Sequence, residues 1–174
     1  MELPPGRHAP NPPEQTQLSS ASFDRQGFTL HPRASFSGSA KLLSKRRYRW
    51  DRLTPLVPWD FAIGWGVLSD ETWVRDLKVT QGSRFMFWHL YDSPLNLRGV
   101  ELSSANVHII PANDEIENTL ASIPAGALVH LRGELVDLEL PGGERVPTSL
   151  IRSDIGPGAC EILFLREIQV QESI

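Results

Sequence analysis

The last fifty residues of the chain alternate apolar runs with glycine- and proline-rich turns, and this pattern constrains the fold most. The run ALVHLRGELVDLEL predicts a long strand, in which Gly133 marks a bulge or sharp coil that lets the strand bend. The segments PGGE, RVPTSLIR and CEILFLREIQV then predict a turn, a strand with Pro147 at an edge position, and a final strand. A long bent strand, a hairpin and a closing strand are typical of a small barrel.

The middle of the chain adds further strands and one helix. Residues 84 to 91 are mostly aromatic and aliphatic and predict a strand, and residues 107 to 110 predict another. The segment NDEIENTLASI predicts a helix with Asn113 as its N-cap. Ile116, Leu120 and Ile123 recur in it at helical spacing. These segments together predict a mainly β, β-rich α+β fold: a small OB-like barrel with two or three short helices.

The aromatic segment VPWDFAIGWGVLSDETWVRDL predicts two short helices, at about residues 58 to 63 and 70 to 77. Pro58 suits a first helical position, and the glycines of GWG would end that helix. Ser69 is the expected N-cap of the second helix. All five tryptophans lie between Trp50 and Trp88, and we interpret them as core residues or as residues partly exposed at one rim. The alternative is a pocket for an aromatic ligand.

The first 22 residues differ from the rest, because they hold five prolines and almost no large apolar side chains. We interpret residues 1 to 22 as a disordered, proline-rich tail or linker and residues 23 to 174 as a single β-rich domain. Residues 1 to 50 carry eight Lys and Arg against three acids, a charge of +5, and residues 51 to 174 carry nine against eighteen, a charge of −9. The acidic body argues against a nucleic acid as the partner.

A short basic cluster leaves one exception to that argument. Its residues Lys45, Arg46, Arg47 and Arg49 alternate with Tyr48 and Trp50. Basic residues with interleaved aromatics can bind single-stranded nucleic acid by phosphate pairing and base stacking. The interpretation we favour is a solvated strand end that pairs with carboxylates of the acidic body.

Several classes of protein lack support in the sequence. No apolar run of 18 residues predicts a membrane span, and the N-terminus does not resemble a signal peptide, so a membrane anchor would belong to a longer form of the chain. The single cysteine, Cys160, excludes an intramolecular disulfide. The five histidines have no metal-ligand spacing, and no cofactor-binding motif is present, so we expect neither a metal nor a cofactor.

The sequence also allows a catalytic hypothesis, centred on Cys160. Cys160 follows the glycine-rich segment SDIGPGA, whose amides could bind an oxyanion. His108 or His89 would be the base, and Asp154 or Asp60 the acid that orients it. Against this hypothesis, a cysteine at the start of an apolar strand is commonly a small buried residue.

His108 and Asn106 have a simpler interpretation. Both alternate with the apolar residues of the strand at 107 to 110, so they face away from the core. We expect them to hydrogen-bond loop backbone beside the barrel, near the segment that contains Arg152 and Asp154. A contact with a ligand or partner is the alternative.

Several motifs occur together: LTPLVPWDFAIGWGVLSD, SSANVHIIPA and TSLIRSDIGPGACE. With them, residues 25 to 170 resemble a family of uncharacterised, mainly proteobacterial proteins whose activity is unassigned. The resemblance implies a soluble part of an often membrane-anchored protein at the periplasmic face of the bacterial envelope, with a cytoplasmic protein as the alternative. The positions shared with the family pattern are Asp60, Gly64, Trp65, Gly66, Ser69, Asp70, Asn106, His108, Pro111, Arg152, Asp154, Gly156, Gly158, Cys160 and Glu161.

The function we expect from the sequence is that of a non-catalytic binding or assembly module of the bacterial envelope, which recognises a protein partner or a small ligand. The candidate binding residues are Trp59, Trp65, Asp70, Asn106, His108 and Arg152. The first alternative is a cysteine-dependent enzyme that uses Cys160, His108 and Asp154. The second is an OB-type binder of single-stranded nucleic acid that uses residues 45 to 50.

Overall fold

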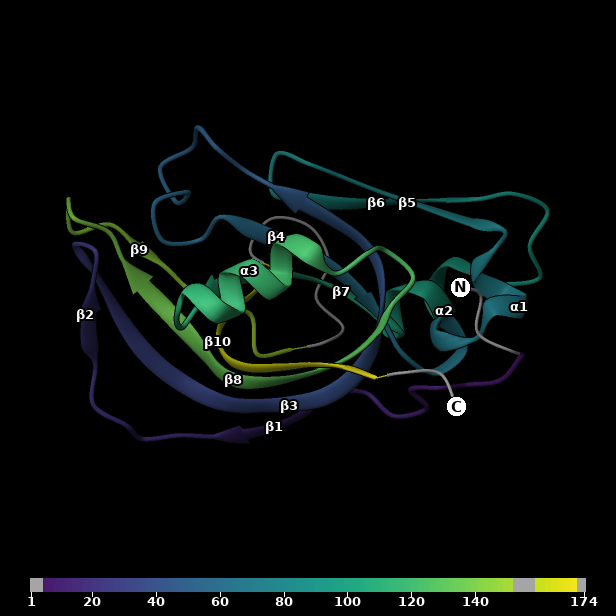
Figure 1. Cartoon of the computed structure of the whole chain (residues 1–174), viewed down its shortest axis with the longest axis horizontal. Helices are drawn as coiled ribbons and strands as arrows, with labels where there is room; N and C mark the ends of the chain where they lie inside the picture. Colours follow the sequence, from purple (N-terminus) through teal and green to yellow (C-terminus); the bar gives the residue numbers. More distant parts are fainter. Residues whose placement is uncertain (1–4, 152–158, 172–174) are drawn as a thin grey trace.

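The computed structural model describes residues 5–151 and 159–171 and shows a β-rich fold (Figure 1). The helical elements are η1 (Gly66–Ser69), α1 (Glu71–Val74), α2 (Leu97–Leu102) and α3 (Asp114–Ser122). The strands are β1 (Glu14–Gln17), β2 (Phe23–Arg25), β3 (Phe28–Arg47), β4 (Trp59–Gly64), β5 (Leu77–Gly82), β6 (Phe85–Leu90), β7 (Ser104–Pro111), β8 (Leu128–Glu139), β9 (Arg145–Val146) and β10 (Glu161–Gln171).

Five strands pair in a ring. The order is β3, β4, β7, β10 and β8, and β8 returns to pair with β3. The pairing of β7 with β10 is parallel, and the other four are antiparallel. The predicted β-rich fold is confirmed, and the ring with α3 supplies the five strands and one helix expected for an OB-like arrangement.

Strand β3 runs through most of the sheet, because its 20 residues pair with β1, β2, β4 and β8. Pro32 lies inside this strand. The register with β8 shifts between Pro32 and Ala34, so the proline lies at a bulge, where a strand tolerates the missing N–H. A second shift, between Leu42 and Ser44, helps β3 to bend from β8 toward β4.

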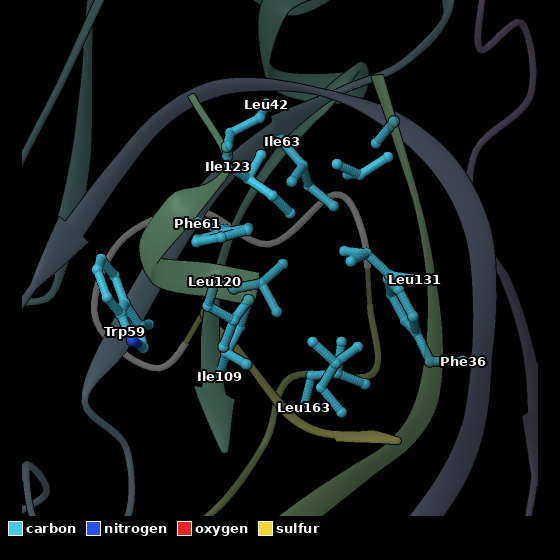
Figure 2. Close-up of a cluster of buried hydrophobic side chains, with 14 of the residues drawn as sticks. Phe36, Leu42, Trp59, Phe61, Ile63, Ile109, Leu120, Ile123, Leu131 and Leu163 are labelled. Carbon is cyan, nitrogen blue, oxygen red and sulfur yellow. The ribbon is translucent and has the colours of Figure 1, made fainter. Parts of the chain in front are cut away.

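The main hydrophobic core fills the inside of the ring (Figure 2). Alternate residues of the ring strands point inward, and α3 adds Ile116 and Leu120, followed by its C-cap Ile123. Asn113 caps α3 by accepting a hydrogen bond from the backbone N–H of Ile116, as predicted. The labelled core residues in Figure 2 are Phe36, Leu42, Trp59, Phe61, Ile63, Ile109, Leu120, Ile123, Leu131 and Leu163.

The helix predicted at residues 58 to 63 is wrong, because residues 59 to 64 form the ring strand β4. All six residues of β4 are buried, since one face meets the ring core and the other is covered. A short apolar run buried on both faces has no alternation that would separate a strand from a helix. The second predicted helix exists as α1, but its N-cap is Asp70, whose side chain accepts from the N–H of Thr72.

Strands β5 and β6 form a hairpin outside the ring, beside β4 and β7 (Figure 1). Strand β6 confirms the strand predicted at residues 84 to 91. The predicted strand RVPTSLIR is shorter than expected, because β9 contains only Arg145 and Val146. It pairs with β8 at the edge of the sheet, as Pro147 indicated.

Residues 1 to 22, which the sequence predicted as a disordered tail, contain the strand β1. Strand β1 pairs antiparallel with residues 34 to 37 of β3. Ahead of it, Ala9 is buried in the main core, and its backbone exchanges hydrogen bonds with the Ser69 hydroxyl. The described part of this segment therefore packs against the domain.

Gly133 lies where the backbone of β10 comes close to β8. A Cβ atom at this position would be 2.0 Å from the carbonyl oxygen of Phe164. The bulge predicted near Gly133 lies on the partner strand, between Leu165 and Glu167 of β10. The glycine thus permits the close approach of the two strands beside this bulge.

We expect Gly133→Ala to lower the free energy of unfolding by about 3 kcal/mol, because β10 must move to admit the methyl group. Urea denaturation measures the change. Gly142→Ala is the control, since a Cβ there meets no atom within 4 Å, and it should shift stability by less than about 0.5 kcal/mol. Equal stability of the two variants would contradict the close approach.

Candidate functional site

The site begins at the pairing of β4 with β7. Their register places Asp60 directly opposite His108. Both side chains lie on the face away from the ring core, because their neighbours Phe61 and Val107 point into it. His108 Nδ1 is 2.7 Å from Asp60 Oδ1, and the Asp60 side chain has no exposed surface.

Cys160 comes to the site from the position just before a third strand. This strand, β10, runs parallel to β7 with Glu161 beside Val107. The half-buried thiol donates to the carbonyl oxygen of Arg84 at 3.6 Å. Cys160 also contributes to the raised pKa of His108, so its side chain lies near the imidazole that binds Asp60.

The β5–β6 turn supplies the fourth member of the site, Arg84. Gly82 pairs with Phe85, so the turn has two residues, Ser83 and Arg84. Their φ angles are 51° and 67°, in the left-handed region that such hairpin turns require and that glycine or asparagine usually fills. A side chain in this region costs about 1 kcal/mol per residue, so other contacts of Arg84 must hold the turn.

The Arg84 guanidinium joins two carboxylates. It donates to both oxygens of Asp51, at 2.7 and 2.9 Å, and to Asp60 Oδ1 at 3.0 Å. It also donates to the carbonyl oxygen of Val57 and stacks on Tyr48, with 4.1 Å from Cζ to the ring centroid. Burial opposes ionisation of Asp51, but the hydrogen bonds and charge of Arg84 outweigh it and lower the pKa of Asp51 to about 2.

Two amides complete the polar network. Asn106 Nδ2 donates to Asp60 Oδ2 at 3.3 Å and to the carbonyl oxygen of Arg84 at 3.1 Å. Gln81 Nε2 in turn donates to Asn106 Oδ1 at 2.7 Å. The carbonyl of Arg84 thus accepts from both Asn106 and Cys160, and the hairpin is joined to β7 by side-chain hydrogen bonds.

The imidazole of His108 is protonated at neutral pH in this environment. Burial lowers its pKa, but the hydrogen bonds to Asp60 and Cys160 and the charges of these two groups outweigh burial and raise the pKa to about 9. The cations of His108 and Arg84 then face the anions of Asp51 and Asp60. These four buried or half-buried charges balance.

Of the residues selected from the sequence, Asn106, His108 and Cys160 come together here, with Asp60 as the carboxylate bound to His108. His108 was expected to bond loop backbone, and it bonds this carboxylate instead. Arg152 and Asp154 lie outside the residues that the structure describes.

The other three candidates lie elsewhere. Trp59 and Trp65 are buried in the main core, and the indole N–H of Trp59 donates to Glu117 at 3.0 Å. Asp70 caps α1. The pKa of Asp70 is lowered: burial opposes ionisation, and the hydrogen bond from the Thr72 backbone is the largest contribution that favours it.

Sequence reasoning missed Arg84, Asp51 and Gln81 as parts of the site. Their side chains meet His108 or its partners only because the hairpin folds onto β4 and β7. Asp60 gave the one available signal, since it is a carboxylate inside the apolar run VPWDFAIG. A charge in such a run is expected to be paired when the run is buried.

Comparison of the chain with protein-family models, with curated proteins and with solved structures finds no match. Among residues 5–151 and 159–171, no cluster of three or more His, Cys, Asp or Glu side chains is suited to hold a metal ion. No helix in the described part of the chain is long and apolar enough to span a membrane.

The raised pKa of His108 predicts a pH-dependent stability. The folded value of about 9 exceeds the ordinary value of about 6.5, so the folded state retains a proton that the unfolded state releases. The stabilisation is complete below pH 6.5 and is lost as the pH rises through 9, by on the order of 3 kcal/mol. Urea denaturation from pH 6 to 9.5 measures it, and His108→Gln should remove this part of the pH dependence.

Arg84 pairs with two carboxylates, so its removal should strongly lower the free energy of unfolding. Arg84→Gln removes one of the two cations that pair with the buried Asp60 carboxylate and the cation that pairs with Asp51, so we expect a loss of about 3 to 5 kcal/mol in the free energy of unfolding. Arg98→Gln breaks an exposed pair with Glu101 and should cost less than about 1 kcal/mol. Similar losses in both variants would contradict the role of Arg84.

Proposed function

We propose that the chain is a cysteine-dependent enzyme in which Cys160 is the nucleophile and His108 transfers the proton. The observation that carries the proposal is the position of His108, which binds Asp60 at 2.7 Å through Nδ1 and whose pKa is raised by Asp60 and by the nearby Cys160. A nucleophile, a base and a carboxylate that orients the base define a catalytic triad by their contacts and not by their order in the chain.

The electrostatics of the site suit a thiolate–imidazolium pair. Asp60 raises the pKa of His108 and keeps the imidazole charged at neutral pH, so an ionised Cys160 would face an imidazolium. Arg84 and Asn106 fix both oxygens of Asp60, so the carboxylate has one orientation. The arrangement favours attack of a thiolate over that of a neutral thiol.

Acyl transfer is the reaction class that this pair serves best. The Cys160 thiolate would attack a carbonyl carbon to form a thioester, and His108 would give its proton to the departing alcohol or amine. Water would then release the acid and regenerate the thiol. The oxyanion donors were expected in the segment before Cys160, of which residues 152–158 lie outside the described residues.

The second candidate is the non-catalytic binding or assembly module expected from the sequence. The extended network of Arg84, Asp51 and Asp60 supports it, because buried ion pairs of this kind also serve to fix one arrangement of a fold. Placement in the bacterial envelope and a protein or small-molecule partner remain parts of this candidate. The resemblance to the proteobacterial family stays a prediction.

Thiol reactivity separates the two candidates, because Cys160 is the only cysteine. We expect the folded protein to react rapidly with a disulfide reagent at pH 6, well below the ordinary cysteine pKa of about 8.5. His108→Gln should slow the reaction at least tenfold at that pH. His89→Ala is the matched control, since His89 lies on the exposed face of β6, and it should leave the rate unchanged.

The same experiment has a clear opposite outcome. A thiol that reacts only after unfolding, or at a rate independent of His108, would overturn the enzyme and favour the binding module. Circular dichroism confirms that each variant is folded before its rate is compared. Hydrolysis of activated acyl esters by the wild-type protein, and its loss in Cys160→Ser, would then define the reaction.

A further inference from the structure

A second surface feature lies away from Cys160, where β3 ends. A groove of about 550 Å³ opens between the end of β3, the segment that leads to β4, and the start of α3. Arginines, an exposed tryptophan and a glutamate line it: Arg25, Arg47, Arg49, Trp50 and Glu117. We propose that this groove binds a nucleotide unit, with its base on Trp50 and its phosphate on the arginines.

The arginines give the groove a local positive character in an acidic chain. Arg25 is held by a hydrogen bond to the carbonyl oxygen of Pro111 and by the ring of Phe164, 5.6 Å from its Cζ. Arg47 lies over the Trp59 ring at 5.4 Å, and Arg49 is exposed. Guanidinium groups fixed in this way lose little entropy when they pair with a phosphate.

Trp50 supplies the surface for a base. Its relative exposure of 95% is the highest among the exposed large hydrophobic residues. A nearly free indole beside arginines is the arrangement in which proteins stack a nucleobase, at about 1 to 3 kcal/mol per base. Figure 1 shows the segment between β3 and β4 as a loop that projects from the sheet.

Glu117 distinguishes a nucleotide from a simple anion. Its Oε1 accepts from the Trp59 indole at 3.0 Å and pairs with Arg47 at 3.2 Å. Its Oε2 is buried and has no hydrogen-bond partner among the described residues. A carboxylate at the groove favours a ligand that brings a hydrogen-bond donor, such as the exocyclic amino group of cytosine, over a simple anion. Asp114 also lines the groove and disfavours a ligand that is only negative.

The inference goes beyond the proposed enzyme and does not depend on it, because no residue of the Cys160 site enters the argument. It also revises the sequence-based expectation that a nucleic acid is an unsuitable partner. That expectation used the charge of residues 51 to 174, whereas the groove takes its arginines from residues 25 to 49, within the first 50 residues, which carry +5.

Binding of AMP, CMP and a labelled ten-nucleotide single strand tests the proposal in 50 mM salt. Trp50→Ala should weaken binding at least tenfold, and Arg49→Gln should weaken it and reduce its salt dependence. The controls are Tyr91→Ala and Arg98→Gln, exposed residues that do not line the groove, and they should bind as the wild type does. All four changes are at the surface, so the variants should fold.

The two sources of a nucleotide give different results, and either one supports the site. Saturable binding of AMP or CMP alone indicates a free nucleotide. Binding of the single strand without the mononucleotides indicates a nucleic acid. Inorganic pyrophosphate that binds as tightly as the nucleotides would overturn the proposal. So would binding that Trp50→Ala leaves unchanged, or no binding of any probe.

Discussion

The buried carboxylate of Asp60 is the constraint around which this structure is organised. An isolated carboxylate without exposed surface would cost several kcal/mol, so the fold must bring cations and donors to it. His108 arrives by the β4–β7 register, Asn106 from the same strand, and Arg84 from a hairpin outside the ring. The need to compensate one charge thus joins the ring and the hairpin.

The same contacts that stabilise Asp60 also orient His108, the proposed base. A carboxylate fixed on both oxygens holds the imidazole in one orientation and in its charged form. The strained Ser83–Arg84 turn is tolerated because Arg84 contributes its side chain, its N–H and its carbonyl to the network. Under the proposed function, the residues that stabilise the fold would therefore also support the reaction.

The groove at Trp50 and the Cys160 site meet at one residue, Tyr48. Tyr48 lines the groove, and it also stacks under Arg84 and accepts the hydrogen bond from the Arg84 N–H. The basic cluster was expected to pair with carboxylates, and it does so in part. Arg47 pairs with Glu117, whereas Lys45 donates to two backbone carbonyl oxygens near the end of α3. The cluster is therefore both anchored to the domain and open to a ligand.

The sequence by itself determined the features that depend on local pattern. These are the strand content, the helix α3 with its Asn113 cap, the edge at Pro147, and the selection of Asn106, His108 and Cys160. Only the tertiary structure decided that residues 59 to 64 are a strand and that Asp60 binds both His108 and Arg84. A run buried on both faces carries no periodicity, and an ion pair across 24 residues leaves no local trace in the sequence.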